Sequence, residues 1–412
     1  MNKLLLSLLL PMLLLAKSFL ISNIPLPKTY IQNLDPYVCD EICMQEYLDN
    51  GQIFSFLAHA DKKLEDATLD EIRVMNISIF NLGSQVLHSA NIKIALLLPY
   101  KRIGKYASST TNAVFAYLMT KGHPFELKSY KIESEDMDAI AVALEEIQDD
   151  GYMYVIAPLT HTGALNLMLL NSDLQIYLPT IHKNSLEETS RNVIFGAIDY
   201  KAQSEMLVQE AVSPLVIFSD QSTTGEKLSQ YQEESFELLN PQNRTIKYYL
   251  PRRKTNLEEY LKENENIVEG SFVVNTPIIK SGMIMSQLTL YDANATNVLS
   301  TQINYNPLIL SMTQYADREN MVVANSIVEK NSVITEANAL LNNDIAYDWI
   351  NYTTTVGMDY FFHSITYEQR EYNIPVVEQQ LQYSIELLQP SLSKFIPYVH
   401  KEREVISDSE EF

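Results

Sequence analysis

The polar residues best suited to ligand chemistry follow apolar segments of the chain. Thr160-His161-Thr162 offers two hydroxyl groups and an imidazole directly after one such segment. If a strand here leads into a helix, the unpaired backbone N–H groups of the helix N-terminus attract a carboxylate, and the cluster would bind an anionic or zwitterionic ligand. Ordinary helix capping by threonine accounts for the same residues equally well.

Other candidate ligand-binding residues stand at comparable places: Tyr100, Lys101, Asp199, Asp220 and Tyr305. The first two could contact an anion, although exposed basic residues are more often simply solvated. Asp199 could mark a hinge, but capping of the following helix is the simpler interpretation. Tyr305 lies in the segment 304–307, where a turn with proline opening a helix competes with ligand contact.

The motifs of the common enzyme classes are missing. The chain has no G-x-S-x-G, no G-x-x-x-x-G-K and no H-E-x-x-H pattern, and it holds 11 glycines and seven scattered histidines. We therefore predict a binding protein without catalytic residues, metal or cofactor. An enzyme of unknown type is the weaker alternative, recognisable by acid and base groups that converge in a cleft.

The two cysteines, Cys39 and Cys43, are expected to form a disulfide if the chain is exported to an oxidising compartment. A regular helix does not bring positions four apart to disulfide geometry, so a bridge requires a turn near Cys39, around Asp35-Pro36. Free thiols are the alternative, and a metal site is disfavoured because no histidine lies within the segment.

The N-terminus predicts export. Lys3 precedes an apolar segment over 4–16 that is shorter than the ~20 residues needed to span a bilayer, which is typical of a secretory signal peptide, assigned to 1–18. An uncleaved membrane anchor is the alternative. No cysteine follows closely, which disfavours a lipid anchor, and no later segment resembles a membrane span. We therefore expect a periplasmic protein that does not insert into the membrane after signal cleavage.

Length and charge narrow the class of protein further. The 412 residues suffice for two domains and a smaller one, and 46% hydrophobic with 20% charged residues is typical of a globular chain. The formal net charge of −22 disfavours nucleic acid as a partner, because the protein's field repels phosphate. The acidic tail 401–412 is expected to be disordered.

The pattern of apolar and polar residues changes at Ile92. The preceding segment, 19–90, is helical in pattern, and we expect two or three helices there. From Ile92 onward, apolar segments of strand length alternate with helical segments, with strands expected at 92–98, 125–132, 152–157, 175–178 and 193–197. A second series follows, with strands expected at 214–219, 245–250, 271–275 and 298–303. This alternation predicts an α/β protein of two tandem, doubly wound parallel-sheet lobes.

The residues after 304 are expected to return to the first lobe, which would comprise 91–200 and 305–400, with lobe 2 at 201–304. Ligands in open parallel sheets bind beyond the carboxyl ends of the strands. We therefore expect an inter-lobe cleft lined by the loops after Leu98, Ala157, Ala197, Ser219, Asn275 and Ile303.

Two strand ends resemble those of a known family. Ile92 to Tyr100, with its Leu-Leu-Pro ending, and Tyr154-Val155-Ile156-Ala157-Pro158-Leu159-Thr160 are similar to the first and third strands of the type I periplasmic binding proteins. The likeness extends over about 92–366 and is strongest to branched-chain amino-acid binding proteins and penicillin-binding-protein activators. Departures are Ala157, where members usually have glycine, and the bulky, basic segment 100–105 in place of a glycine-rich loop.

The resemblance implies one of two roles. The first is a periplasmic solute-binding protein whose lobes close on a small polar ligand, an amino acid or peptide, with Thr160 and Thr162 placed as the family's ligand hydroxyls and Asp220 as the nearest candidate for its acidic residue. The second is a non-catalytic envelope protein that docks a protein partner, which the bulky segment after Pro99 and the helical N-terminal segment favour.

A modification site is also predicted. Asp292-Ala293-Asn294-Ala295-Thr296 fits the Asn-x-Thr acceptor pattern and resembles its extended bacterial form, with an acidic residue two positions before the asparagine. A glycan at Asn294 would require a host that has the transferase.

Overall fold

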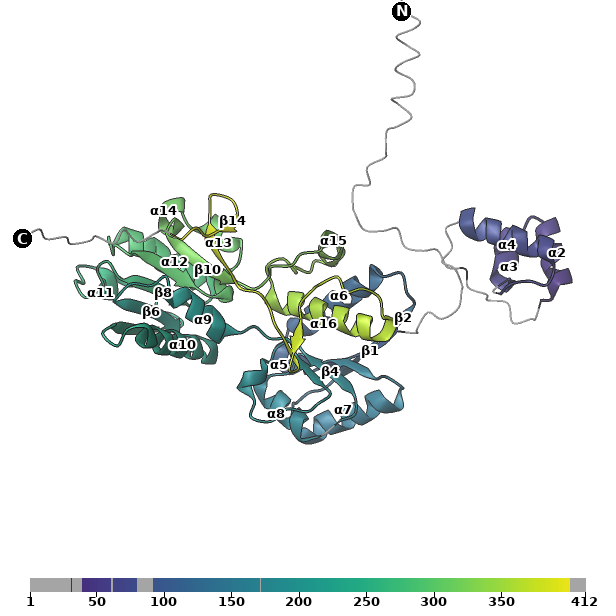
Figure 1. The fold of residues 1–412 in the computed structure, drawn as a ribbon, viewed down its shortest axis with the longest axis horizontal. Coiled ribbons are helices and arrows are strands. Elements are labelled where there is room, and N and C mark those ends of the chain that lie inside the picture. The colour runs from purple at the N-terminus through teal and green to yellow at the C-terminus, as the bar shows by residue number, and fades with distance from the viewer. Residues whose placement is uncertain (1–30, 32–38, 61, 80–91, 171, 401–412) are drawn as a thin grey trace, which may run out of the picture.

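The computed structural model describes residues 31, 39–60, 62–79, 92–170 and 172–400 of the chain (Figure 1). The predicted signal peptide, the segment around Asp35-Pro36 and the acidic tail lie outside these residues. Within the described part of the chain, no helix combines the length and the apolar character needed to cross a bilayer.

The described residues of the N-terminal segment form three helices, purple in Figure 1: α2 (Glu41–Asp49), α3 (Ile53–His59) and α4 (Ala67–Ile79). Phe56 and Leu57 are at most 4% exposed and form the centre of its core. Within residues 39–60 and 62–79, the helical character predicted for the segment 19–90 is confirmed.

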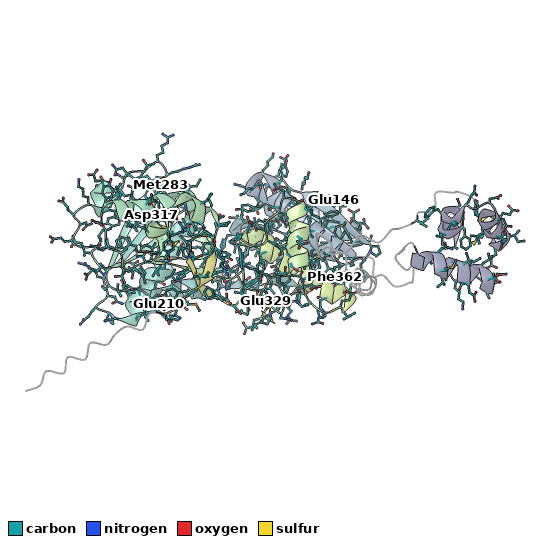
Figure 2. All side chains as sticks on the ribbon, turned by 90° about the horizontal axis from the view of Figure 1, so that it is seen from above. Glu146, Glu210, Met283, Asp317, Glu329 and Phe362 are labelled. Atoms are coloured by element: carbon teal, nitrogen blue, oxygen red, sulfur yellow. A yellow bond between two sulfur atoms is a disulfide. The ribbon has the colours of Figure 1, made fainter. Side chains whose placement is uncertain are left out.

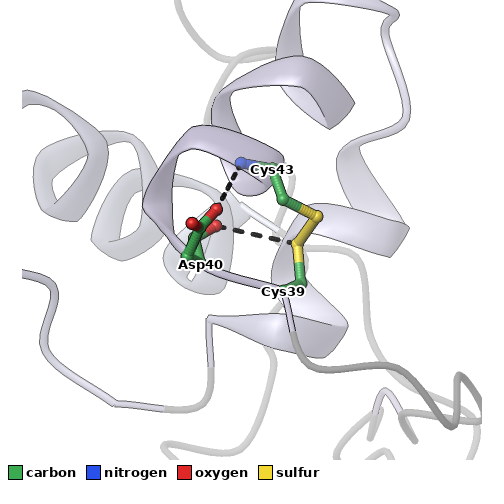
Figure 3. The surroundings of a disulfide bond; sticks show 3 residues. All are labelled: Cys39, Asp40 and Cys43. Atoms are coloured by element: carbon green, nitrogen blue, oxygen red, sulfur yellow. Dashed lines mark hydrogen bonds between the residues drawn. A yellow bond between two sulfur atoms is a disulfide. The ribbon is translucent and has the colours of Figure 1, made fainter.

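Cys39 and Cys43 are joined by a disulfide with a Cα–Cα distance of 5.4 Å (Figure 3). Helix α2 begins at Glu41, after its N-cap residue Asp40, whose Oδ1 accepts a hydrogen bond from the Cys43 backbone N–H at 3.0 Å. Cys39 therefore precedes the helix and is not bound by helical geometry, which is why a spacing of four permits the bridge.

The first lobe is a seven-stranded sheet in the order β11-β12-β5-β4-β3-β1-β2. Its strands are β1 (Ile92–Leu98), β2 (Phe125–Lys131), β3 (Tyr154–Ile156), β4 (Gln175–Leu178), β5 (Val193–Phe195), β11 (Val376–Val377) and β12 (Gln380–Leu381). All neighbours pair in parallel except β11 with β12. Alternate residues of β1 face opposite layers: Ile94 and Leu96 pack with α6 and α16, whereas Ala95 and Leu97 pack with α7 and α8. Burial on both faces explains the nearly continuous apolar sequence of β1, which only the half-buried Lys93 interrupts.

The helices of this lobe are α5 (Tyr100–Ile103), α6 (Tyr106–Met119), α7 (Met137–Asp149), α8 (His161–Leu169), α15 (Ser332–Leu340) and α16 (Trp349–Thr366). A short 3-10 helix, Lys183–Ser185, follows β4.

The second lobe repeats the plan with the order β14-β13-β10-β9-β8-β6-β7. Its strands are β6 (Leu215–Asp220), β7 (Thr245–Leu250), β8 (Ser271–Asn275), β9 (Asn297–Ser300), β10 (Met321–Asn325), β13 (Glu386–Pro390) and β14 (Phe395–Pro397). Its helices are α9 (Tyr200–Val208), α10 (Thr223–Leu239), α11 (Glu258–Leu261), α12 (Ile278–Leu290), α13 (Leu308–Met312) and α14 (Tyr315–Arg318). In both lobes the first five strands follow the same order, so the predicted α/β class with two doubly wound lobes is confirmed.

The chain passes between the sheets three times, at 196–199, 326–331 and 382–385. Figure 2 labels Glu329 on the second of these crossings. We predicted that lobe 2 comprises 201–304 and that 305–400 returns to lobe 1. This assignment needs correction, because β10, β13 and β14 belong to the second sheet. The end of the predicted strand at 298–303 also differs: Gln302–Asn304 is a 3-10 helix.

A buried hydroxyl cluster holds two crossings to α16. The Tyr177 hydroxyl donates to the Thr353 carbonyl at 2.7 Å, and the Thr353 hydroxyl donates to the Gly196 carbonyl at 2.7 Å. The Thr353 and Tyr383 hydroxyls lie 2.8 Å apart. Gly196 is in the first crossing and Tyr383 in the third, so the cluster joins both chain segments to α16.

Two helix glycines provide a matched test of this packing. A Cβ at Gly357 of α16 would lie 2.1 Å from the fully buried Tyr177 ring, whereas at Gly282 of α12 it would meet the flexible end of Met312 at 2.7 Å. We expect Gly357→Ala to lower the free energy of unfolding by about 1–3 kcal/mol. Gly282→Ala should leave it unchanged or raise it, because alanine is the better helix former by ~1 kcal/mol. Equal effects in denaturant titrations would contradict this account.

Candidate ligand-binding cleft

A cleft of about 710 Å³ lies between the lobes, at the carboxyl ends of the lobe 1 strands. Lobe 1 lines it with the segments after β3 and β4 and with the start of α16, and lobe 2 lines it with one face of α10. Residues 197–199 of the first crossing and the first two residues of α9 also line it. Both lobes therefore contribute to one concave site.

Thr160 lines the cleft, but its polar groups are already engaged. Its backbone N–H donates to Glu135 Oε1 at 2.7 Å, and its hydroxyl donates to Glu135 Oε2. Glu135 is 5% exposed. Gly163 makes room for this carboxylate, because a Cβ there would lie 2.6 Å from Glu135 Oε1. A carboxylate of the protein itself thus occupies the position at the α8 N-terminus predicted for a ligand.

Two histidines border the cleft. His161 lies 2.8 Å through Nε2 from the Ser185 carbonyl oxygen, so this nitrogen carries the proton. His182 accepts a hydrogen bond at Nδ1 from the Asn184 N–H at 3.2 Å, and its Nε2 lies 3.7 Å from Asp199 Oδ2. Burial lowers the pKa of His182, and the nearby Asp199 carboxylate opposes this effect. His182 is therefore held neutral, with Nε2–H towards Asp199.

Asp199 also caps α9, because its Oδ1 accepts a hydrogen bond from the Ala202 N–H at 2.9 Å. The capping interpretation of Asp199 is correct, and the residue lines the cleft as well.

The lobe 2 wall is one face of α10, the α10 face, formed by Thr223, Thr224, Lys227, Leu228 and Tyr231. Helical periodicity places these residues on one side of α10. The α10 N-terminus is fixed by Ser222, whose hydroxyl accepts from the Gly225 N–H at 3.0 Å and donates to Asp220 Oδ1 at 2.5 Å. Asp220 thus positions the helix and is not among the lining residues.

The rest of the lining is mainly apolar and aromatic: Ile103, Leu159, Ile181, Ile198, Tyr200, Trp349 and Ile350. The indole of Trp349 packs edge-on against Tyr383, with ring centroids 4.7 Å apart. Its Nε1–H is buried and has no hydrogen-bond partner within the described residues.

The predicted site residues separate into two groups. Thr160, His161 and Asp199 line the cleft, whereas Tyr100, Lys101, Thr162, Asp220 and Tyr305 are not among its lining residues. Tyr100 and Lys101 both contact the exposed Glu133 instead, at 3.2 and 2.7 Å. Tyr305 is 3% exposed and packs against Tyr347 and Phe395, and burial raises its pKa to about 12.

The sequence prediction missed the segment 179–185, the α10 face and Trp349 with Ile350. The first could have been found, because the strand-end rule applies to β4 as it does to β3. The α10 face carries a helical spacing, but nothing in the sequence shows which side of a helix faces another lobe.

The lowered pKa of His182 predicts a pH dependence of stability. In the unfolded chain the group titrates near its ordinary value of 6.5, and in the fold it titrates below that value. The unfolded state therefore binds more protons between the two values, so this stability is present above the unfolded pKa and is lost as the pH falls from there through the lower pKa of the folded state. Between about pH 7.5 and about pH 5.5 the melting temperature should fall more in the wild type than in His182→Asn, which retains an acceptor for the Asn184 N–H. If the melting temperatures of the wild type and of His182→Asn fall by the same amount, this prediction is wrong.

No protein-family model and no curated protein matches the chain. Solved structures match its fold. The leucine-binding protein LivK of Thermotoga maritima is 12% identical, with a TM-score of 0.53 over 75% of this chain and 98% of that one. The C-domain of Haemophilus influenzae LpoA, a regulator of PBP1A, is 9% identical, with a TM-score of 0.51 over 74% of this chain and 100% of that one.

A second structure of Haemophilus influenzae LpoA is 10% identical, with a TM-score of 0.50 over 88% of this chain and 72% of that one. The residues from 92 onward make up less than four fifths of this chain, so this match includes residues of the N-terminal segment. At such identities the matches establish a shared fold.

Proposed function

We propose that this chain, whose fold is that of the type I periplasmic binding proteins, is a non-catalytic binding protein that holds a small organic ligand between its lobes. The cleft of about 710 Å³ carries the proposal. Small-molecule sites typically enclose about 300–1,000 Å³. Of helix α5, in the bulky segment after Pro99, Ile103 alone lines the cleft, so this segment leaves the space open.

Closure of the lobes around the ligand would use the three crossings as hinges. The likeness to LivK, a leucine-binding protein, supports a binding role, and the predicted signal peptide supports a periplasmic location. An amino acid or peptide is the ligand class predicted from the sequence.

Calorimetry with a panel of amino acids, short peptides and small organic acids tests the proposal. We expect at least one member to bind and to raise the melting temperature, since a ligand at 100 times its Kd stabilises a fold by about 2.7 kcal/mol. Absence of heat and of any melting shift across the panel would contradict it.

A second candidate function is that of an envelope protein that docks a cell-wall enzyme. The match to LpoA favours it, because that match reaches beyond the two lobes into the N-terminal segment. Binding to a purified penicillin-binding protein would test it. If the docking role is correct, Thr224→Trp, which fills the cleft, should leave this binding unchanged. No binding at micromolar concentration would remove its support.

We also propose Asn294 as a glycosylation site. Asn294 is exposed, in the turn after α12, and Asp292 stands two positions before it. Coexpression with a bacterial oligosaccharyltransferase should add one glycan mass, which Asn294→Gln and Asp292→Asn should abolish. Asn243→Gln is the control, because Asn243-Arg244-Thr245 lacks the acidic residue. An unmodified wild-type chain would refute the proposal.

A further inference from the structure

The charged side chains that line the cleft are mainly basic, whereas the chain as a whole is strongly acidic. The chain has a formal net charge of −22, yet its cleft is lined by Lys201 and Lys227 and by a single carboxylate, that of Asp199. Asp199 is engaged by the α9 N-terminus and lies beside His182. An acidic surface with a basic cleft concentrates anions in the cleft relative to the rest of the surface.

The two walls of the cleft differ in the polar groups that they offer to an anionic ligand. On the lobe 1 side, the N–H and hydroxyl of Thr160 are held by the buried Glu135 carboxylate, and a second carboxylate brought there would be repelled. On the lobe 2 side, the α10 face presents the ammonium of Lys227 and the hydroxyls of Thr223 and Thr224, all three exposed. Each helix start has a carboxylate of the protein beside it, Glu135 at α8 and Asp220 at α10, but only the α10 wall adds an exposed ammonium group, that of Lys227, and it is therefore the more favourable wall for an anionic group.

The remaining surface is suited to an apolar body. Leu159, Ile181, Ile198, Leu228, Trp349 and Ile350 line the cleft. Transfer of an apolar group to these side chains stabilises the complex by ~25 cal/mol per Å² of surface removed from water. A free ammonium group on the ligand would gain nothing from this surface.

We infer that the cleft selects an organic monoanion with an apolar or aromatic body, whose charged group meets Lys227 on α10, and that it discriminates against α-amino acids. The inference rests on the proposed binding function and names its ligand class. A zwitterion would have to place its ammonium group beside the lysines, against aliphatic side chains, or at Asp199, whose carboxylate already caps α9 and lies 3.7 Å from His182 Nε2.

Three probes that share a phenyl ring but differ in their charged groups test the inferred selectivity: 3-phenylpropanoate, L-phenylalanine and 2-phenylethylamine. Trp349 is the one tryptophan of the chain and lines the cleft, so its fluorescence reports occupancy directly, and calorimetry gives the affinities. We expect 3-phenylpropanoate to bind at least about tenfold more tightly than phenylalanine. Both ligands offer a carboxylate to Lys227, but phenylalanine must also desolvate its ammonium group, and a buried charged group without a partner costs at least about that factor. The amine should bind most weakly.

Lys227→Met should reduce the affinity for 3-phenylpropanoate about tenfold. Lys262→Met is the control, because Lys262 is exposed, pairs with Glu258 at 2.9 Å and does not line the cleft. Phenylalanine or a peptide binding as well as 3-phenylpropanoate would overturn the inference and leave the binding function standing. No binding by any of these probes or by the amino-acid and peptide panel would overturn both.

Discussion

Replacing Asp359 by asparagine is expected to lower the free energy of unfolding by about 3–5 kcal/mol. Asp359 is fully buried in α16 and accepts four hydrogen bonds within the described residues, from Tyr117 Oη at 2.8 Å, Arg370 Nε at 3.1 Å, and the backbone N–H groups of Glu371 and Tyr372 at 2.8 and 3.3 Å. Every partner is a donor, so a carboxylate, which only accepts, satisfies them all.

Asparagine keeps the shape of Asp359 but points an NH₂ group at donors. It also leaves the guanidinium of Arg370, whose side chain is 17% exposed, without its buried counter-ion. Breaking a buried pair on one side costs far more than the pair itself contributes, because the remaining charge stays desolvated.

Denaturant titration and thermal melting measure this effect. Asp173→Asn is the matched control, because Asp173 is exposed and the same chemical change should shift stability by less than about 0.5 kcal/mol. If both substitutions change the free energy of unfolding by a similar, small amount, the Asp359–Arg370 pair does not stabilise the segment after α16.

Filling the cleft with a tryptophan at position 224 is expected to abolish ligand binding. Thr224 is exposed in the first turn of α10 and its side chain lines the cleft, so the substitution places an indole in the space between the lobes without disturbing a core. Steric exclusion of this kind should lower affinity by at least about a hundredfold, a loss of about 2.7 kcal/mol or more of binding free energy.

Gln230→Trp is the matched control for this change. Gln230 is exposed on the same helix, does not line the cleft, and donates a surface hydrogen bond to Glu234 at 2.7 Å. Both variants should melt close to the wild-type temperature. If Thr224→Trp binds the probes with wild-type affinity, the ligand does not occupy the inter-lobe cleft, and the proposed function fails at its main observation.

The sequence by itself determined the class of the fold, because strand and helix segments carry different periodicities of burial. The nearly continuous apolar sequence of β1 and the alternation after it sufficed to predict two parallel-sheet lobes, and the strand-end rule pointed to Thr160, His161 and Asp199. The disulfide was predicted from the expected oxidising compartment, whereas the spacing of four argued against a bridge within a regular helix. Each of these inferences uses neighbours in sequence, whose spacing the backbone fixes.

The tertiary structure alone decided the assignment of β10, β13 and β14 to the second lobe, and the chemistry of the cleft. Glu135 meets Thr160 across 25 residues of chain, and Lys227 and Trp349 reach the cleft from opposite lobes. No local pattern reports such contacts, because they depend on how helices pack on the sheets and where the three crossings place the lobes. Whether a threonine at a helix start is free for a ligand or already holds a carboxylate is therefore settled by packing.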